Sequence, residues 1–225
     1  NNTFRKIPVC KANNAFIYDY HLDSMGRLWA AVYNYGLCIF DKNMHEFVKA
    51  SDFFSKPSLQ FDEPIALGED IKYLYVGGER GLIRFPKEIH HPEFAIDRHK
   101  TKSAIFSFYT SGQSVWIGSW NENLWQYNPE FDVIKRINIK EAFGLKDSME
   151  LVCMTETKDE FHFAFNNGLI LITDTNLKPI QKNTICISSA HTPLTYYEII
   201  YPYRFYYARG KLIVVDSRNN TRRFL

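Results

Sequence analysis

Short apolar runs rich in aromatic and β-branched residues alternate with turn residues along most of the chain. Residues 23–41 show the pattern clearly: DSMGRLWAAVYNYGLCIFD contains a turn, an apolar run, a second turn that ends in glycine, and another apolar run closed by aspartate. Runs of about four to eight such residues between turn signals predict β-strands. Two runs joined by a tight turn predict an antiparallel hairpin.

The same hairpin pattern recurs along the chain. The segments that align with residues 27–41 are YLYVGGERGLIRF, SVWIGSWNENLWQYN, EFHFAFNNGLILITD and RFYYARGKLIVVD, with anchors at Gly36, Gly81, Asn123, Gly168 and Gly210. Gly and Asn readily adopt a positive φ, which a tight turn between antiparallel strands requires. The anchor spacing alternates between 45 and 42 residues, and a period of about 40 to 50 residues is typical of propellers and solenoids.

Each repeat has an apolar run before its hairpin, and a shorter, more polar run follows. We expect inner strands at residues 15–22, 104–110 and 150–157, and outer strands at 46–50, 93–97, 133–139 and 221–225. Four strands per repeat predict an all-β fold, a β-propeller of four-stranded antiparallel blades. The five visible repeats span residues 15–50, 59–97, 104–139, 150–183 and 196–225. Only residues 141–150, between two repeats, could hold a helical turn.

The extent of the propeller follows from the repeat phasing. Residues 4–9, FRKIPV, look like an outer strand of a repeat whose other strands are missing, yet the last repeat has its own outer strand. A ring closed by a borrowed terminal strand would not need both. We therefore expect residues 1–225 to be a single segment of a larger propeller, and a self-contained five-bladed ring is the alternative.

The first repeat resembles the two-component regulator propeller repeat, which runs Asp-x-x-Gly-x-Leu-Trp-Ile-Gly-Thr, then Gly-Leu and an aromatic residue followed by Asp. The matching residues are Asp23, Gly26, Leu28, Trp29, Gly36, Leu37, Phe40 and Asp41, and in the third repeat Trp116, Ile117, Gly118, Ser119, Leu124, Tyr127 and Asn128. The second repeat has Tyr75 in place of the tryptophan and a hairpin shorter by one residue. The fourth and fifth repeats lack the Asp-x-x-Gly element.

This resemblance implies the periplasmic sensor region of a bacterial hybrid two-component system, a class that often responds to oligosaccharides. Members typically carry two seven-bladed propellers, an immunoglobulin-like domain, a membrane span and a kinase module. The resemblance therefore implies a periplasmic, non-enzymatic segment whose partners are the remainder of a sensor kinase or a second protomer. Any kinase activity would reside in regions absent from this chain.

Charge and hydropathy narrow the choice of partners. Twenty-seven Lys and Arg residues face 25 Asp and Glu residues, a balance that argues against a nucleic-acid partner. No run of roughly 18 to 20 apolar residues could span a bilayer, so we expect no membrane contact by this segment. The chain starts without a signal-peptide pattern, so we expect it to be cytosolic, already processed or part of a longer polypeptide.

Catalytic and metal-binding motifs are not found in the sequence. The four cysteines, Cys10, Cys38, Cys153 and Cys186, have no Cys-x-x-Cys spacing; Cys38 and Cys153 lie in apolar runs and are expected to be buried thiols. No Gly-x-Ser-x-Gly motif occurs. His90 and His91 are expected on a solvated loop, and the glycines of residues 75–81 open a strand where a phosphate loop would open a helix. We expect no catalytic residues, no metal and no cofactor.

The tryptophans divide by their place in the repeat. Trp29 and Trp116 occupy equivalent positions in the second strand and are predicted to lie in the core between neighbouring blades. Trp120 precedes the anchor and Trp125 follows it. We therefore expect Trp120 to be exposed.

The hairpins between second and third strands should all emerge on one face of a propeller. Aromatic platforms beside amides and charged groups suit a carbohydrate, so we expect this face to bind an oligosaccharide. The candidate binding residues are Tyr33, Tyr35, Arg80, Trp120, Asn121 and Asn166. The alternatives are a propeller lyase acting on a polysaccharide or lactone, and a scaffold for protein–protein interaction.

Overall fold

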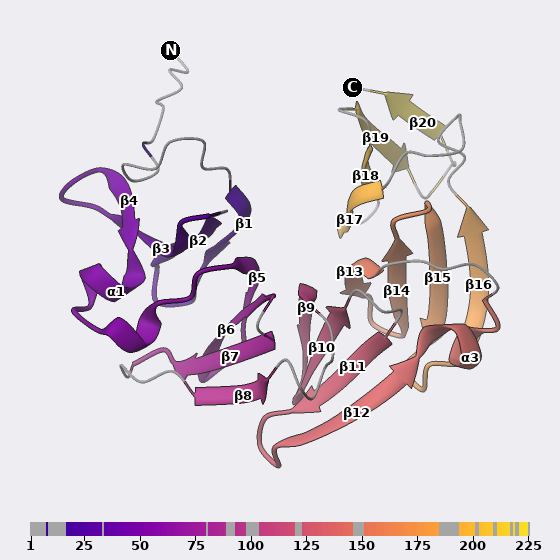
Figure 1. Cartoon of the computed structure of the whole chain (residues 1–225). Coiled ribbons are helices and arrows are strands. Elements are labelled where there is room, and N and C mark those ends of the chain that lie inside the picture. The colour runs from indigo at the N-terminus through magenta and orange to yellow at the C-terminus, as the bar shows by residue number, and fades with distance from the viewer. Residues whose placement is uncertain are drawn as a thin grey trace. The chain divides into compact units, whose positions relative to one another are not determined.

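The protein is a chain of four-stranded antiparallel sheets (Figure 1), seen in a computed structural model. The structure describes residue 8 and residues 17–32, 34–79, 81–88, 93–97, 104–119, 123–145, 151–184, 194–200, 203–208, 211–216, 218 and 221–224. The chain divides into two compact units, unit 1 over residues 1–105 and unit 2 over residues 106–225. We treat each unit by itself.

Unit 1 contains two sheets whose strands follow one another in chain order. Sheet 1 consists of β1 (Ile17–Leu22), β2 (Leu28–Val32), β3 (Gly36–Asp41) and β4 (Glu46–Lys49). Sheet 2 consists of β5 (Pro64–Glu69), β6 (Tyr73–Gly78), β7 (Gly81–Pro86) and β8 (Glu93–Asp97). The strands match the first two predicted repeats.

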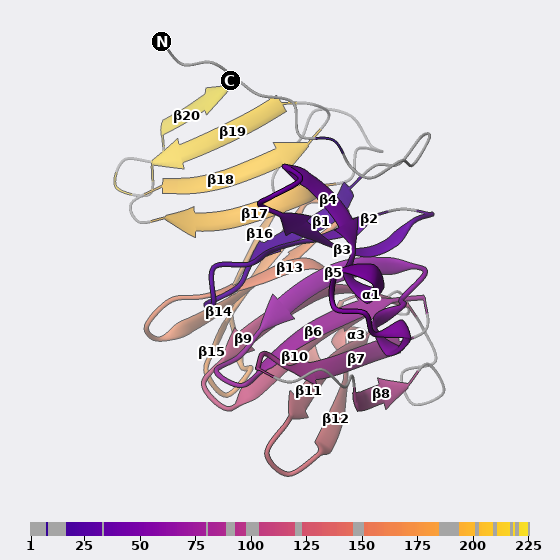
Figure 2. The ribbon, with the colours of Figure 1, turned by 90° about the vertical axis from the view of Figure 1, so that its left-hand side faces the viewer.

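Unit 2 repeats the same topology in three further sheets. Sheet 3 consists of β9 (Ile105–Ser111), β10 (Ser114–Ser119), β11 (Asn123–Asn128) and β12 (Val133–Asn138). Sheet 4 consists of β13 (Leu151–Glu156), β14 (Glu160–Phe165), β15 (Leu169–Asp174) and β16 (Pro179–Thr184). Sheet 5 consists of β17 (Leu194–Ile200), β18 (Tyr203–Ala208), β19 (Lys211–Asp216) and β20 (Thr221–Phe224), which lie side by side in Figure 2.

The all-β prediction and the four-strand repeat are therefore confirmed. Closure into a ring, the number of blades and a single continuous propeller segment stay predictions. Residues 4–9 lie outside the described residues except for Pro8.

In the described residues, short helical segments interrupt the strands, and they differ from the sequence prediction in position. The predicted helical turn is α3 (Ile139–Phe143), which begins earlier than expected because the Asn138 side chain accepts hydrogen bonds from the Lys140 and Glu141 N–H groups. Between sheets 1 and 2 lie α1 (Ala50–Phe53) and the 3₁₀ helix η1 (Pro57–Leu59). Limiting helix to residues 141–150 was wrong, because single turns of this length leave no periodic pattern.

Three of the glycine anchors have the positive φ that the repeat requires. Gly36, Gly81 and Gly168 have φ values of 115°, 95° and 84°. Gly36 and Gly81 begin β3 and β7, and Asn123 begins β11 at the matching place. Gly210 lies outside the described residues.

The two sheets of unit 1 pack face to face. Trp29, Ala31, Leu37 and Ile39 of sheet 1 form one buried cluster with Leu67, Leu74, Val76, Ile83 and Phe85 of sheet 2. Side chains of a strand alternate between the two faces of its sheet. The face of sheet 1 that carries Trp29 therefore packs on the face of sheet 2 that carries Leu74 and Val76, which is opposite to the face that carries Tyr75. The inner strands β1 and β5 lie in contact.

Unit 2 follows the same packing rule. Trp116 and Leu124 of sheet 3 form one cluster with Phe161, Phe163 and Leu171 of sheet 4, and the rings of Trp116 and Phe161 lie 5.4 Å apart. The other face of sheet 4 contributes Ala164, Ile170 and Ile172, which pack on Ile213 and Val215 of sheet 5. Within each unit, the same face of each sheet therefore packs on the following sheet, an arrangement that we call head-to-tail stacking.

The structure confirms the predicted core tryptophans. Trp29 is 0% exposed and Trp116 is 4% exposed. Trp29 stacks on Phe54 at 5.9 Å and meets Phe85 at 5.6 Å between ring centroids. Trp125 is also buried, and Trp120 lies outside the described residues.

We expect Trp29→Ala and Trp116→Ala each to lower the free energy of unfolding by about 3 to 5 kcal/mol, because each leaves a large cavity between sheets. Urea denaturation measures the change. Phe131→Ala is the control, because Phe131 is exposed in the turn before β12; Trp120→Ala should likewise cost far less. Equal losses in the tryptophan and control variants would contradict the assignment of the core.

In sheet 4, His162 takes the position that Trp116 takes in sheet 3, as the third residue of the second strand. Its side chain is buried, with Nε2 3.2 Å from Glu160 Oε2. Burial lowers the pKa of His162, the nearby Arg204 charge lowers it further, and the Glu160 carboxylate opposes both. The imidazole is therefore favoured in its neutral form in the folded protein.

A lowered pKa makes the unfolded chain bind the proton more readily than the folded chain. The stability from neutral His162 should be present above the unfolded pKa of about 6.5 and decline as the pH falls below it. We expect His162→Phe to show a smaller loss of melting temperature than wild type between about pH 7.5 and 5.5. The control His45→Asn removes an exposed histidine and should lose as much melting temperature as wild type over this pH range. An equal loss in His162→Phe and wild type would refute the assignment.

Candidate functional site

The hairpins between second and third strands leave sheets 1 and 2 at the same end of unit 1. The link between the two sheets holds both of them there. The Leu37 N–H group donates to the Phe61 carbonyl at 3.1 Å, and the Glu79 N–H group donates to the Glu63 carbonyl at 3.4 Å. We call this region, residues 34–36, 61–63 and 78–79, the hairpin end of unit 1.

Glycine is required where the link crosses the hairpins. A Cβ atom on Gly36 would lie 2.8 Å from the Phe61 carbonyl oxygen, and one on Gly78 would overlap the Glu63 carbonyl oxygen. Both contacts involve backbone, which cannot rotate away. The close approach therefore positions the two hairpins against each other.

The side chains at the hairpin end are an amide, an aromatic ring and several acids. Asn34, at φ 56°, and the acids Asp62 and Glu63 are exposed, while Tyr35 and Glu79 are half-buried. Asp62 accepts a hydrogen bond from the Gln60 amide at 3.0 Å. Sequence reasoning missed Asp62 and Glu63 because it considered only the hairpins, although the FDEP segment between repeats was a visible signal. The described part of this end is acidic.

Tyr35 is oriented toward the outer strand of its own sheet. The Lys49 Nζ atom lies 4.7 Å from the centre of the Tyr35 ring, within the range of a cation–π contact. The ring also packs against the cluster of Ala30, Val32, Cys38 and Phe47. Tyr35 is therefore engaged by Lys49 and the cluster, and it remains half-buried.

The other predicted binding residues have different outcomes. Tyr33, Arg80, Trp120 and Asn121 lie outside the described residues. Asn166 is half-buried in the hairpin of sheet 4, beside Asn167, whose side-chain oxygen accepts from the Leu169 N–H group at 3.0 Å. Tyr35 belongs to unit 1 and Asn166 to unit 2.

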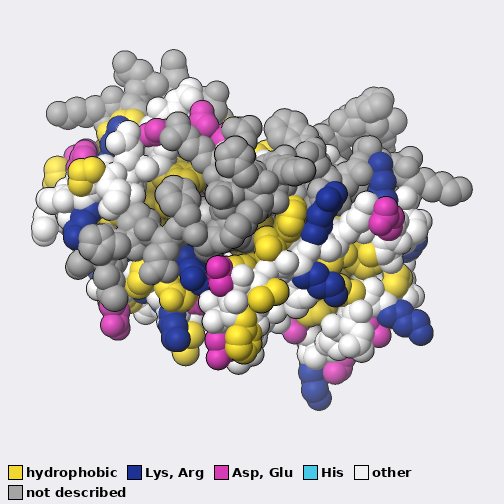
Figure 3. All heavy atoms as spheres, turned by 60° about the horizontal axis from the view of Figure 1, so that its bottom comes forward, with side chains coloured by type: hydrophobic (Ala, Val, Ile, Leu, Met, Phe, Trp, Pro, Cys, Tyr) yellow, Lys and Arg dark blue, Asp and Glu magenta, His cyan; other side chains and the backbone are white. Residues whose placement is uncertain are grey.

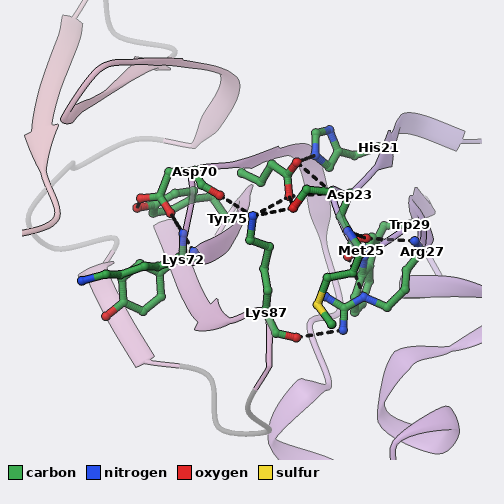
Figure 4. A network of polar contacts seen from close by, with 12 residues as sticks. His21, Asp23, Met25, Arg27, Trp29, Asp70, Lys72, Tyr75 and Lys87 are labelled. Carbon is green, nitrogen blue, oxygen red and sulfur yellow. Dashed lines mark hydrogen bonds and ion pairs between the residues drawn. The ribbon is translucent and has the colours of Figure 1, made fainter.

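At the opposite end of unit 1, the turn before β2 is organised around the Asp23 carboxylate (Figure 4). Oδ1 accepts hydrogen bonds from the Met25 and Arg27 N–H groups at 3.0 and 2.9 Å. Oδ2 accepts from Arg27 Nε at 2.6 Å and from the indole Nε1 of Trp29 at 2.8 Å. The buried carboxylate thus joins the turn to the core tryptophan, which explains the Asp-x-x-Gly-x-Leu-Trp pattern.

Sheet 2 has a related arrangement that the sequence comparison missed. The Asp70 carboxylate accepts from the Lys72 and Tyr73 N–H groups at 2.7 Å each and from the Tyr75 hydroxyl at 2.7 Å. Asp70 therefore plays the part of Asp23, and the tyrosine hydroxyl replaces the indole N–H group. The signal was present, because an aspartate stands five residues before Tyr75.

Lys87, which follows β7, ties the two turns together (Figure 4). Its buried Nζ atom donates to Ser24 Oγ at 2.7 Å, to Glu69 Oε2 at 3.1 Å and to the Asp70 carbonyl. Its own carbonyl accepts from Arg27 Nη1 at 2.9 Å. The charge is fully paired, and the network is therefore a clamp between sheets 1 and 2.

The electrostatics of Asp23 follow from these contacts. Burial alone would raise its pKa, but the hydrogen bonds from Trp29 and Arg27 and the Arg27 charge outweigh it and hold the pKa below its ordinary value. Asp19 on β1 shows the opposite balance: burial raises its pKa despite hydrogen bonds from the Leu67 and Tyr20 N–H groups. Asp23 is thus held as a carboxylate, and its role in the turn is structural.

The described residues contain no cluster of three or more His, Cys, Asp or Glu side chains that could hold a metal ion. Cys38 is buried, with its thiol 3.7 Å from the Gly36 carbonyl oxygen, and Cys153 is half-buried. On the face shown in Figure 3, basic and acidic side chains are interspersed. Within the part of the chain that the structure describes, no helix is long and apolar enough to cross a membrane.

Comparison with solved structures shows the fold in other proteins. No protein-family model matches the chain, and no curated protein matches it in sequence. The extracellular domain of a hybrid two-component system of B. thetaiotaomicron superposes with a TM-score of 0.73 at 15% identity, over 97% of this chain and 28% of that one. The chain shares its fold with the extracellular domains of two-component systems.

Two further structures support the same architecture. The extracellular domain of another B. thetaiotaomicron hybrid two-component system matches with a TM-score of 0.59 at 14% identity, over 92% of this chain and 26% of that one. The WD40 β-propeller domain of Doa1 matches with a TM-score of 0.64 at 12% identity, over 95% of this chain and 69% of that one. The chain spans less than a third of the two-component structures. The sequence resemblance is thus confirmed at the level of the fold.

We expect Asp23→Asn to lower the free energy of unfolding by about 2 to 3 kcal/mol. The NH₂ group of the asparagine would face buried groups that are themselves donors, and the negative charge that these donors stabilise would be lost. The difference from wild type should narrow as the pH falls through the lowered pKa of Asp23, since protonation removes the same charge. Urea denaturation at neutral and acidic pH measures both effects.

Asp41→Asn is the matched control, because Asp41 also caps a turn by accepting from the Asn43 and Met44 N–H groups, at an exposed site. An asparagine oxygen can accept both bonds, so the expected change is below about 0.5 kcal/mol. An equal effect of the two substitutions would show that burial of the Asp23 network does not matter.

Proposed function

We propose that the chain is a segment of a non-enzymatic, extracytoplasmic sensory β-propeller, with its five sheets as successive blades. The observation that carries the proposal is the similarity over 97% of the chain to the extracellular domain of a two-component system. The Asp-Gly-Leu-Trp signature of the first repeat supports the same class independently, because it comes from residues and not from the superposition. The head-to-tail stacking within each unit is the packing that a propeller requires.

We propose the hairpin end as the ligand site and an oligosaccharide as its ligand. Tyr35 offers an aromatic surface, and Asn34 an exposed amide beside it. Sugar rings stack their C–H faces on aromatic rings, while amides and carboxylates accept and donate the hydrogen bonds that hydroxyl groups lose on leaving water. Tyr33 and Arg80 belong to the same hairpins of unit 1, and Trp120, Asn121 and Asn166 are proposed as ligand contacts at the corresponding hairpins of unit 2.

The described charges refine the ligand class. Asp62, Glu63 and Glu79 place carboxylates at the hairpin end of unit 1. An anionic sugar would meet like charges there, and carboxylates readily accept hydrogen bonds from neutral hydroxyl groups. The proposal therefore favours a neutral oligosaccharide over an acidic one.

Calorimetric titration with matched neutral and acidic oligosaccharides tests the proposal. We expect a neutral oligosaccharide to bind, and Tyr35→Ala, Arg80→Ala and Trp120→Ala each to weaken it about tenfold, as expected for the loss of about 1.4 kcal/mol. Tyr20→Ala is the control, since it removes an exposed tyrosine from β1 and should bind as wild type does.

Unchanged affinity in all three variants would move the ligand site elsewhere. Stronger binding of acidic sugars would contradict the role given to the carboxylates. Release of an unsaturated sugar product during incubation would indicate a lyase, and the absence of any sugar binding together with capture of a protein partner would indicate a scaffold.

A further inference from the structure

The contact between neighbouring sheets recurs within both units, each time with the same two faces. One face carries the tryptophan position of the second strand, which is Trp29, Trp116 or His162, and we call it the tryptophan face. The opposite type of face on the following sheet covers it, and we call that one the receiving face. A sheet with a neighbour on each side therefore has both of its faces covered.

The inner strand of the receiving face is buried in sheets 2 and 4. Leu67 of β5 is 7% exposed and Met154 of β13 is 6% exposed. Each of them pairs with the residue that follows the tryptophan position of the second strand. Tyr20 of β1 holds the same place in sheet 1, because it pairs with Ala30. It therefore marks the position on the receiving face of sheet 1 that a neighbouring sheet would bury.

The receiving face of sheet 1 is open along β1. Tyr20 is 72% exposed, and Leu22, which lies two residues further on and on the same face, is 65% exposed. The remainder of the face, on the other strands of the sheet, is largely buried in a small cluster that includes Ala30, Cys38 and Phe47. A large aromatic and a large aliphatic side chain are thus exposed at a place that other sheets bury. Such a patch indicates an interaction surface.

Sheet 5 is open on the other type of face. Its receiving face is buried, because Ile213 and Val215 pack on sheet 4. Its tryptophan position is Phe205, the third residue of β18, which is half-buried together with Val214, its partner on β19. Tyr203, on the same face, is 39% exposed. The residues at the tryptophan position of the other four sheets are all buried: Trp29, Tyr75, Trp116 and His162.

The two open faces are of the two types that pack on each other within the units. We propose that the tryptophan face of sheet 5 in one copy of the chain docks on the receiving face of sheet 1 in a second copy. A second copy is the occupant because the chain itself carries both halves of a contact that it already makes between its sheets. The aromatic side chains of sheet 5 then lie against Tyr20 and Leu22, in the kind of apolar and aromatic contact that stabilises interfaces.

The proposed contact joins two different faces and is therefore heterologous. Each copy can take part in two such contacts, one through sheet 1 and one through sheet 5. The proposal rests on the packing of the sheets, and it is independent of the proposed ligand and of the sensory role.

Sedimentation velocity over a concentration series, without added sugar, tests the proposal. We expect the wild-type chain to associate as its concentration rises. The receiving-face variant, Tyr20→Lys with Leu22→Lys, and the tryptophan-face variant, Tyr203→Lys, should each need a concentration about tenfold higher or more, because a lysine in an apolar contact loses its hydration. Ile71→Lys is the matched control: Ile71 is 90% exposed in the turn between β5 and β6, outside both faces, and this variant should associate as wild type does.

Mixing the two variants makes the test specific for a contact between unlike faces. The receiving-face variant keeps its tryptophan face, and the tryptophan-face variant keeps its receiving face, so a single contact can form between them. We expect the mixture to form a dimer with one copy of each variant and to stop there, because both of the remaining faces are substituted. Circular dichroism checks that each variant is folded, and Leu22→Gln and Tyr203→Gln replace a variant that is not.

Three results would overturn the proposal: a wild-type chain that stays monomeric at every concentration, a variant on either face that associates as wild type does, or a mixture of folded variants that forms no dimer. The first of these would leave a sheet of a different polypeptide as the occupant of the open faces.

Discussion

The buried carboxylate of Asp23 is the constraint on which the first two sheets depend. A buried carboxylate must be paired, and Asp23 meets that requirement with donors from its turn, from Arg27 and from the indole of Trp29. Trp29 in turn fills the core between sheets 1 and 2. One polar group therefore fixes the turn, the orientation of the largest core side chain and the spacing of two sheets.

The clamp at this end has a consequence at the other end of unit 1. Lys87 holds the turns of both sheets together, and the link at residues 61–63 holds their hairpins. Each sheet is thus tied to its neighbour at both ends of its strands. Side chains at the hairpin end therefore stand on a backbone that is held at both ends, which is the preorganisation that the proposed ligand site requires.

Much of the fold could be predicted from the sequence because it depends on a period. The anchors Gly36, Gly81 and Gly168 require a positive φ that few residues adopt, so their spacing locates the hairpins directly. Trp29 and Trp116 could be placed in the core for the same reason. The helix α1 could not be predicted, since a single turn leaves no periodic signal, and the Asp70–Tyr75 pair was missed because a hydroxyl replaces the indole donor.

The candidate site was harder to predict than the fold because its residues do not share one repeat position. Asp62 and Glu63 come from a link between repeats, and they reach the hairpin end only through backbone contacts at glycine positions. Repeat alignment compares like positions and therefore overlooks residues that the links contribute. The same reasoning applies to the edge of β4, where Pro8 contacts a strand far along the chain. In a protein built from repeats, the period determines the framework, and the segments that break the period determine which surfaces are covered and which can bind a ligand.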